Sequence, residues 1–245
     1  MNFWRFLMKK KIFIGIGLLC LVLLVVAGVF LGKKIQDKNA TVSGDVAAPG
    51  QKEEMQQLFP YEVAEGVYVM SAESYSGAFV EDGSDREVEN IWQIKIENTT
   101  GRDIQFLRVR ANLGGEEAVF DVSTLIAGSS AMVLETNALA WKSGVEQMSF
   151  TAENLAYFQY ERTIFPEVFS LSVTDQTLRL ENISENDVSG DVYVYYKNME
   201  EDVFIGGITY RVKFSGGIRA GEALAEQASH YQSDKSKILF ITYGQ

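Results

Sequence analysis

Apolar and polar residues alternate along several segments of this chain, and no other feature constrains its fold as strongly. The alternation runs through residues 92–96, 107–113, 169–173 and 208–214. A period of two places successive side chains on opposite faces of a strand, so each of these strands has one buried and one solvated face. Antiparallel sheets carry this pattern, whereas buried parallel strands are apolar throughout. The chain is therefore predicted to be mainly all-β, with antiparallel β-sandwich domains of the immunoglobulin-like kind.

A short motif occurs twice in the chain. "IENTTGRDI" begins at Ile96 and "LENISENDV" begins at Leu180. Each copy is followed by an Ala-Gly pair, 29 residues after Asn98 in the first copy and 38 residues after Asn182 in the second. The additional residues of the second copy fit a longer hairpin in "YYKNMEEDVFIGG", turning at "KNMEED". We interpret the echo as a structural duplication with an insertion in a loop, where insertions are tolerated. The alternative is chance similarity between short β motifs.

The repeated motif itself predicts a corner between two strands. Asn and Asp side chains cap nearby backbone groups and tolerate left-handed dihedral angles, which suits a short turn. The echo also favours a strand within residues 220–231, whereas residues 151–165 are compatible with a short helix. Three Gly-Gly pairs punctuate the chain. The pairs at 114–115 and 216–217 predict hairpin turns, and the pair at 206–207 predicts a bulge or a close approach of two backbones.

Residues 12–32 contain neither a charge nor a proline. A helix of these 21 residues would be about 31 Å long, enough to cross a hydrocarbon core of about 30 Å. Four basic residues precede this segment and two follow it directly, which favours an N-terminus inside the cell and a body outside. A cleaved signal peptide is the alternative, although its apolar core would be shorter and an Ala-x-Ala site would follow. We therefore predict a single-pass protein of the cell membrane, anchored in the lipid bilayer through residues 12–32.

Composition and proline positions divide the rest of the chain. Residues after the apolar segment are polar, without a sustained period, which indicates a flexible linker. Pro60 and Pro166 each stand just before strand-like sequence and suggest where domains begin. The predicted organisation is a cytoplasmic N-terminus at 1–11, a transmembrane helix at 12–32, a linker at 33–59, and β-sandwich domains at 60–165 and 166–245.

Net charge also separates the membrane segment from the body. The chain has 22 basic and 33 acidic residues, and six of the basic but none of the acidic ones lie in the first 34 positions. The remainder carries 16 basic against 33 acidic residues, a net charge of −17. Such a charge disfavours nucleic acid and anionic lipid as partners of the body. Because Cys20 is the only cysteine, the body has no disulfide and is expected to rely on its core for stability.

Few residues are suited to catalysis or metal binding. His230 is the only histidine and no cysteine follows Cys20, which excludes a Cys–His pair and a multi-histidine metal site in the body. Acidic residues gather at 81–89, 114–118 and 199–203, in turn-like sequence where carboxylates are solvated. Hydrolysis by paired acids would require two carboxyls that converge in a cleft, and calcium binding by the acidic loops stays open. We assign no catalytic, cofactor-binding or metal-ligating residue and expect no enzymatic activity.

The strand around residue 194 offers possible contact residues. Tyr193 and Tyr195 lie on the face opposite the valines of "VYVYYKN", and exposed tyrosines are good contact residues. The possible protein-contact residues are therefore Tyr193, Tyr195, Lys197 and Asn198. Alternatively, the tyrosines cover a second layer or a neighbouring loop.

The second copy resembles a known family of envelope domains. "LENIS", "VYVYYKN" (residues 192–198) and "IRAGEAL" (residues 218–224) are similar to the Asn turn, the V-x-V-x-Y strand and the late Ala-Gly-Glu turn of FxLYD-type domains in membrane-anchored bacterial proteins. The resemblance covers about the last 70 residues and extends loosely to the first copy. It implies an extracytoplasmic immunoglobulin-like sandwich without known catalysis.

These observations predict a single-pass envelope protein that presents two β-sandwich domains to bind or scaffold another protein. One alternative is a structural spacer or subunit of a surface or secretion assembly. A second alternative is an envelope hydrolase that uses carboxylates. A binding protein should expose an aromatic patch, a spacer should show polar faces and a stable contact between domains, and a hydrolase should show converging acids in a cleft.

Overall fold

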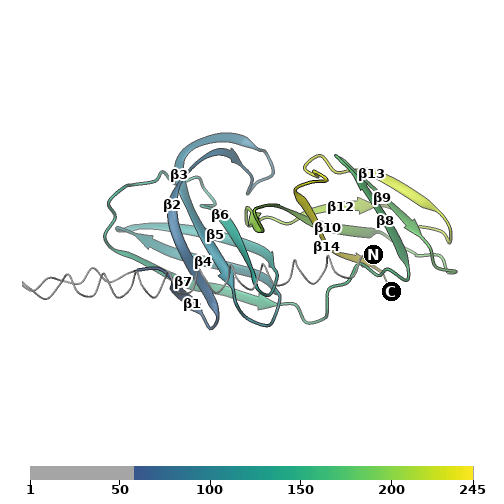
Figure 1. Ribbon diagram of the computed structural model, residues 1–245, viewed down its shortest axis with the longest axis horizontal. Helices are drawn as coiled ribbons and strands as arrows, with labels where there is room; N and C mark the ends of the chain where they lie inside the picture. The colour runs from purple at the N-terminus through teal and green to yellow at the C-terminus, as the bar shows by residue number, and fades with distance from the viewer. Residues whose placement is uncertain (1–57, 245) are drawn as a thin grey trace, which may run out of the picture. The chain divides into compact units, whose positions relative to one another are not determined.

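The computed structural model describes residues 58–244, and every regular element in this range is a β-strand (Figure 1). The predicted membrane segment at residues 12–32 and most of the linker at 33–59 lie outside the described residues. Within residues 58–244, no helix is long and apolar enough to cross a membrane. The prediction of a mainly all-β body is confirmed, and the described residues belong to one compact unit.

The first seven strands form what we call the first repeat. They are β1 (Tyr61–Ala64), β2 (Val67–Phe79), β3 (Arg86–Asn98), β4 (Ile104–Leu113), β5 (Glu116–Leu125), β6 (Ser129–Leu134) and β7 (Met148–Tyr157). Strands β2, β3 and β6 pair in one antiparallel layer, and β5, β4 and β7 pair in another. Trp92, Ile94 and Ile96 of β3 are buried in the same apolar cluster as Leu107 and Val109 of β4, as the alternation predicts.

The last seven strands form the second repeat. They are β8 (Phe169–Thr174), β9 (Thr177–Asn182), β10 (Val192–Glu200), β11 (Val203–Ile205), β12 (Tyr210–Phe214), β13 (Ala223–Gln227) and β14 (Ser236–Tyr243). Strands β8, β9 and β13 pair in one layer, and β12, β10 and β14 pair in the other. In chain order these layers match β2-β3-β6 and β5-β4-β7 of the first repeat. The predicted duplication is therefore confirmed by strand pairing.

The first corner is organised by Asn98, the last residue of β3, whose side chain is fully buried. Its Nδ2 donates hydrogen bonds to the carbonyl oxygens of Arg102 and Leu125, both at 3.0 Å. Its Oδ1 accepts hydrogen bonds from the backbone N–H of Thr100 at 3.1 Å and from the Thr100 hydroxyl at 2.6 Å. One side chain thus pairs backbone groups that the turn leaves without strand partners.

Asn182 ends β9 and builds the second corner in the same way. This side chain is also fully buried. Its Nδ2 donates to the carbonyl oxygens of Asn186 at 2.8 Å and Ile218 at 2.9 Å. Its Oδ1 accepts from the backbone N–H of Ser184 at 3.0 Å and from the Ser184 hydroxyl at 2.7 Å. The two asparagines are therefore equivalent in burial and in every hydrogen-bond role.

The acidic end of each motif meets the Ala-Gly pair that follows it much later in the chain. Asp103 accepts a hydrogen bond from the backbone N–H of Ala127 at 2.8 Å, and Asp187 accepts one from Ala220 at 2.9 Å. The motif and its distant Ala-Gly partner therefore form one structural corner in each repeat. The prediction that "IENTTGRDI" marks architecture is confirmed.

The repeats differ in the hairpin that follows β10. It turns at Glu201 and Asp202, which adopt φ angles of 47° and 66°, at the position predicted from "KNMEED". Strand β11 then pairs in parallel with β6 of the first repeat, with Val203 opposite Ser130. The inserted residues therefore form a strand that joins the repeats, where the sequence had suggested a loop.

The structure confirms the predictions for two of the three Gly-Gly pairs. The pair at 114–115 forms the turn between β4 and β5, as predicted. A Cβ added at Gly207 would lie 1.7 Å from the carbonyl oxygen of Asp121, so the predicted close backbone approach is confirmed. The prediction of a hairpin turn at 216–217 is wrong. That pair lies between β12 and β13, which belong to different layers.

Two further outcomes concern the core and the ambiguous segments. Residues 148–157 form β7, so no helix occupies the start of the segment at 151–165, and the strand expected within 220–231 is β13. Residue 166 falls between β7 and β8. However, Phe204, Leu239 and Phe240 of the second repeat belong to the buried apolar cluster of the first, so apolar packing continues across the repeats.

Candidate protein-contact face

The outer face of the sheet β12-β10-β14 carries the two tyrosines singled out from the sequence. Val192, Val194 and Tyr196 of β10 are buried in the core of the second repeat, whereas Tyr193 and Tyr195 are half-buried. This division follows from the alternation of side chains along a strand. The predicted placement of both tyrosines opposite the valines is confirmed.

Strand register places four other residues beside the tyrosines. Tyr195 lies between Arg211 of β12 and Phe240 of β14, and Tyr193 lies between Lys213 and Thr242 in the adjacent row. We define the tyrosine face by these six residues: Tyr193, Tyr195, Arg211, Lys213, Phe240 and Thr242. Its three strands hold the rings and cations at fixed spacings, because cross-strand neighbours on one face are about 4.5–5.5 Å apart.

The side chains of the tyrosine face already contact one another. The rings of Tyr195 and Phe240 stack with centroids 4.3 Å apart and an interplanar angle of 14°. The guanidinium of Arg211 lies 4.8 Å from the Tyr193 ring centroid, and the Lys213 ammonium lies 6.0 Å from it. Cations at these distances are attracted to the ring faces. The tyrosine face is therefore ordered by its own contacts.

Asp191 anchors one end of the tyrosine face. Its carboxylate lies 2.7 Å from the Lys213 ammonium and accepts a hydrogen bond from the backbone N–H of Gly216 at 3.1 Å. The hydrogen bond with Lys213 and the one from Gly216 hold the pKa of Asp191 below its usual value, and the same carboxylate raises the pKa of Lys213. Because Asp191 balances Lys213, Arg211 is the cation of the face without a carboxylate partner among the described residues.

A hollow of about 400 Å³ adjoins the tyrosine face through Phe240 and Thr242. Its wall continues along the segment between the repeats, where Tyr160 is 88% exposed. The ring of Phe158 meets Phe240 edge-on at 5.5 Å. Arg162 lies against the Phe158 ring at 5.5 Å and donates to Asp103 at 2.9 Å. The hollow is therefore lined by aromatic rings held in place by an ion pair.

Lys197 and Asn198 do not belong to this surface. Lys197 follows Tyr193 and Tyr195 on the same side of β10, but the first repeat covers the strand at this point and Lys197 is fully buried. It is thus not available to an external partner in this structure. Asn198 points elsewhere, accepting a hydrogen bond from the Ser236 hydroxyl at 2.6 Å and donating to the carbonyl of His230 at 3.1 Å.

His230 lies in the loop between β13 and β14. Its Nδ1 is 3.1 Å from the Asp85 carboxylate, and its ring stacks on Tyr210 with centroids 4.7 Å apart. A hollow of about 280 Å³ lies beside it. The ring is thus held between a carboxylate and an aromatic face in a contact that joins the two repeats.

Two carboxylates that line one hollow are engaged in structural contacts. Asp121 and Glu81 line a hollow of about 200 Å³. However, Asp121 pairs with Arg108 through two bonds of 2.7 and 2.6 Å, and Glu81 accepts backbone N–H bonds from Leu134 and Gly207. In the part of the chain that the structure describes, no group of three or more His, Cys, Asp or Glu residues could hold a metal ion.

No protein-family model matches the chain, and no curated protein matches it. The tyrosine face must therefore be interpreted from its own chemistry. Sequence reasoning did not predict the hollow or four residues of the face, because the register between strands far apart in the sequence brings them together. These residues are Arg211, Lys213, Phe240 and Thr242.

Proposed function

We propose that the protein is a single-pass, membrane-anchored protein of the cell envelope that binds or scaffolds another protein through its tyrosine face. The observation that most supports this proposal is the row formed by the exposed Arg211 and the half-buried Tyr195, whose ring stacks on the buried Phe240. Tyrosine, phenylalanine and arginine are enriched at protein interfaces, and tyrosine and arginine dominate binding hot spots. A row of them that is already ordered loses little side-chain entropy on binding.

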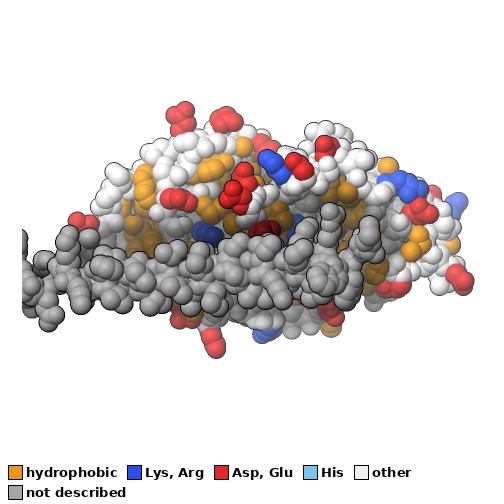
Figure 2. All heavy atoms as spheres, viewed as in Figure 1, with side chains coloured by type: hydrophobic (Ala, Val, Ile, Leu, Met, Phe, Trp, Pro, Cys, Tyr) orange, Lys and Arg blue, Asp and Glu red, His pale blue; other side chains and the backbone are white. Residues whose placement is uncertain are grey.

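The location rests on the N-terminal sequence and on charge. Residues 12–32 are long and apolar enough to span a bilayer, and the basic residues before them favour a body outside the cell. On the face drawn in Figure 2, acidic side chains outnumber basic ones, in keeping with the net charge of −17 for residues 35–245. This charge favours a protein partner over nucleic acid or an anionic membrane surface.

The architecture of the body is part of the same proposal. Each repeat pairs its strands in two facing antiparallel layers and closes a corner with a buried asparagine. This arrangement supports two immunoglobulin-like sandwiches, at residues 60–165 and 166–245, with the second similar to FxLYD-type domains. The resemblance favours an extracytoplasmic binding or scaffolding role over catalysis.

Photo-crosslinking of the full-length protein in its native membrane tests the binding role. A photoreactive amino acid would replace Thr242, which is exposed on the tyrosine face, or Ser172, which is exposed on β8. We expect one discrete protein adduct from position 242 and none from position 172. Arg211→Glu should abolish the adduct at 242. Equal adducts at both positions, or an adduct unaffected by Arg211→Glu, would contradict the proposed face.

The spacer role is the second candidate, because the two repeats are joined by the β11–β6 pairing. A stable contact of this kind suits a rigid support as well as a binding protein. No adduct at any position of the tyrosine face in the native membrane would favour the spacer. Crosslinking would then be expected only through segments outside the described residues.

A further inference from the structure

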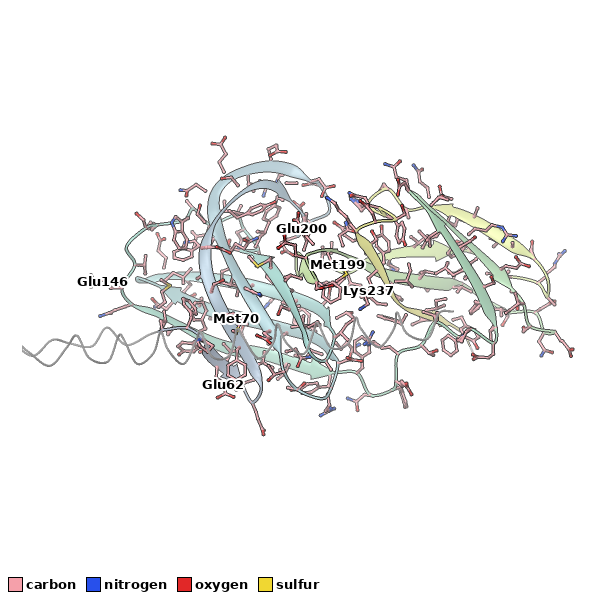
Figure 3. The ribbon with its side chains drawn as sticks, viewed as in Figure 1. Glu62, Met70, Glu146, Met199, Glu200 and Lys237 are labelled. Atoms are coloured by element: carbon pink, nitrogen blue, oxygen red, sulfur yellow. The ribbon has the colours of Figure 1, made fainter. Side chains whose placement is uncertain are left out.

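The hairpin that joins the repeats brings a lysine into the interior. Lys197 of β10 is fully buried, and its Nζ donates hydrogen bonds of 2.9 Å to two carbonyl oxygens. One carbonyl belongs to Ser123 of β5 in the first repeat, and the other belongs to Gly207 in the second. A single amine therefore connects both repeats at their junction. Met199 and Glu200, which end the same strand, lie with Lys237 of β14 at this hairpin (Figure 3).

The backbone of Gly207 is held by the first repeat from both sides. Its N–H faces the Glu81 carboxylate, with Oε1 at 3.0 Å and Oε2 at 2.9 Å. Its carbonyl accepts a hydrogen bond from the backbone N–H of Ser123 at 2.8 Å. The Thr209 hydroxyl completes the network by donating to the Ser123 carbonyl at 2.9 Å. Opening this junction would therefore expose Lys197 and Glu81 to water together.

The hydrogen bonds around Lys197 match a neutral amine. An ammonium group has three N–H donors, but only two acceptors lie at hydrogen-bonding distance from this Nζ among the described residues. No described carboxylate forms an ion pair with Lys197, because Glu81 directs its oxygens to backbone N–H groups. The Phe204 ring lies 5.8 Å from the amine. A buried charge in such surroundings is costly, whereas a neutral amine donates two hydrogen bonds and leaves no donor unpaired.

We propose that the junction is a proton-linked latch, in which Lys197 loses its proton when the β10–β11 hairpin closes onto the first repeat and regains it when the hairpin opens. The burial of Lys197 and its two hydrogen bonds support this proposal, which is independent of the proposed binding role. Burial also lowers the pKa of Lys197 to about 7, although the charge of Glu81 acts in the opposite direction. In the open junction a solvated Lys197 has an ordinary pKa of about 10.4.

Several titratable groups surround the latch. Glu81, on the loop after β2, has a raised pKa, chiefly because it is buried. Asp121 on β5 is paired with Arg108. From the second repeat, Tyr210 has a pKa raised by burial to about 12, and Lys237 of β14 lies opposite Lys197 in the ladder. The Asp85–His230 pair stacks on Tyr210. Of these groups, Lys197 alone is fully buried.

The direction of the linkage follows from the two pKa values. Between about pH 7 and pH 10, the open junction binds one proton more than the closed junction. Lowering the pH through this window therefore favours opening, and raising the pH favours closure. Below about pH 7 the amine is protonated in both states, and Lys197 contributes no further dependence. Protonation of Glu81 at lower pH then favours closure, because its pKa is raised in the closed state.

Lysine side-chain NMR tests the titration directly. The full-length protein would carry ¹³C at the ε carbon of lysine, in detergent or a nanodisc. We expect one resonance to titrate near pH 7, to vanish in Lys197→Met and to shift to lower pH in Glu81→Gln, since Glu81 raises this pKa. Titration of every lysine above about pH 9 in the folded protein would overturn the proposal. If Lys197→Met fails to fold, the shift in Glu81→Gln decides the test.

Hydrogen exchange tests the link to opening. After correction for intrinsic rates, peptides covering residues 199–207 should lose up to about tenfold in protection for each pH unit between 9.5 and 7.5. Peptides from β9 serve as the control and should keep their protection. Lys197→Met should remove the slope from residues 199–207, as should Lys197→Leu if the first variant is unstable. An equal slope in both regions, or a slope that persists without Lys197, would overturn the latch.

Discussion

The two repeats share their corners and the pairing of six strands each, but they differ in β1, which only the first repeat has, and in the hairpin after β10. Nine consecutive residues and a later Ala-Gly pair determine the buried asparagine corner. This corner occurs twice, with the same hydrogen bonds. The hairpin after β10 has no counterpart in the first repeat, where β4 and β5 turn directly at two glycines. Local motifs thus build each repeat, whereas the insertion determines how the repeats join.

This difference shows which contacts can occur in both repeats and which are specific to the junction between them. Corners satisfy buried backbone groups and are interchangeable in principle, since each depends on its own neighbourhood. The junction depends on groups far apart in sequence, such as Glu81 and Gly207, which meet across 126 positions. Variants of the junction should therefore have larger and less transferable effects than variants of the corners.

The largest effect is expected from Gly207→Ala. The added Cβ would lie 1.7 Å from the Asp121 carbonyl oxygen, so the backbones of the two repeats must separate. We expect the free energy of unfolding to fall by about 3 kcal/mol or more, measured by urea denaturation of the full-length protein. Gly101→Ala is the matched control, because nothing lies within 4 Å of its Cβ position. Equal stabilities of the two variants would show that the junction does not constrain position 207.

The next largest effects are expected from removing the buried asparagine of each corner. Asn98→Ala and Asn182→Ala each remove a fully buried amide and leave two carbonyls and one backbone N–H without that partner. Each variant should lose about 2–4 kcal/mol of stability, since unpaired buried groups cost about 1–3 kcal/mol each and relax in part. Equal losses would support the equivalence of the corners. A large difference, measured by the same denaturation, would show that the corners are alike only in geometry.

A smaller effect is expected from pH. The pKa of Lys197 is lowered in the folded protein to about 7, so the unfolded chain binds more protons above this pH and stability should rise as pH increases. We expect a gain of about 2 kcal/mol between pH 7 and 9. Tyr210 has the opposite slope, but its pKa is raised to about 12, so it acts only above about pH 10.

Lys197→Met is the control for this pH dependence. Its stability should be lower throughout, because the carbonyls of Ser123 and Gly207 lose a donor. Its stability curve should nevertheless be flat between pH 7 and 9. A rise with pH that persists in this variant would place the responsible group elsewhere.

The sequence predicts features that depend on neighbouring residues. The alternation around Ile94, the corners at Asn98 and Asn182 and the close approach at 206–207 follow from short motifs, and the structure confirms them. The burial of Lys197 could not be predicted, since alternation places it beside two half-exposed tyrosines and only the first repeat covers it. The role of Glu81 was equally hidden, because an acidic residue in a turn is usually solvated.

The residues of the tyrosine face also divide into those that the local sequence predicts and those that it does not. Tyr193 and Tyr195 were predictable because their phase against the valines is local. Arg211 and Phe240 were not, since their places depend on the registers of β12 and β14 against β10. At the Gly-Gly pair 216–217, a local motif led to a wrong prediction. Its sequence resembles a hairpin turn, but the chain passes there from one layer to the other.

The smallest expected effect concerns the tip of the joining hairpin. The first-repeat turn uses Gly114 and Gly115, with φ angles of 68° and 94°, whereas the second uses Glu201 and Asp202, with φ angles of 47° and 66°. Residues other than glycine and asparagine are disfavoured at such angles. Replacing Glu201–Asp202 by Asn-Gly should therefore stabilise the protein by about 0.5–1 kcal/mol, because this pair suits a two-residue turn with positive φ at both positions. The gain should appear as slower hydrogen exchange in residues 199–207 and leave β9 unchanged. If exchange in residues 199–207 becomes faster, the acidic side chains hold the hairpin by contacts that outweigh their backbone strain.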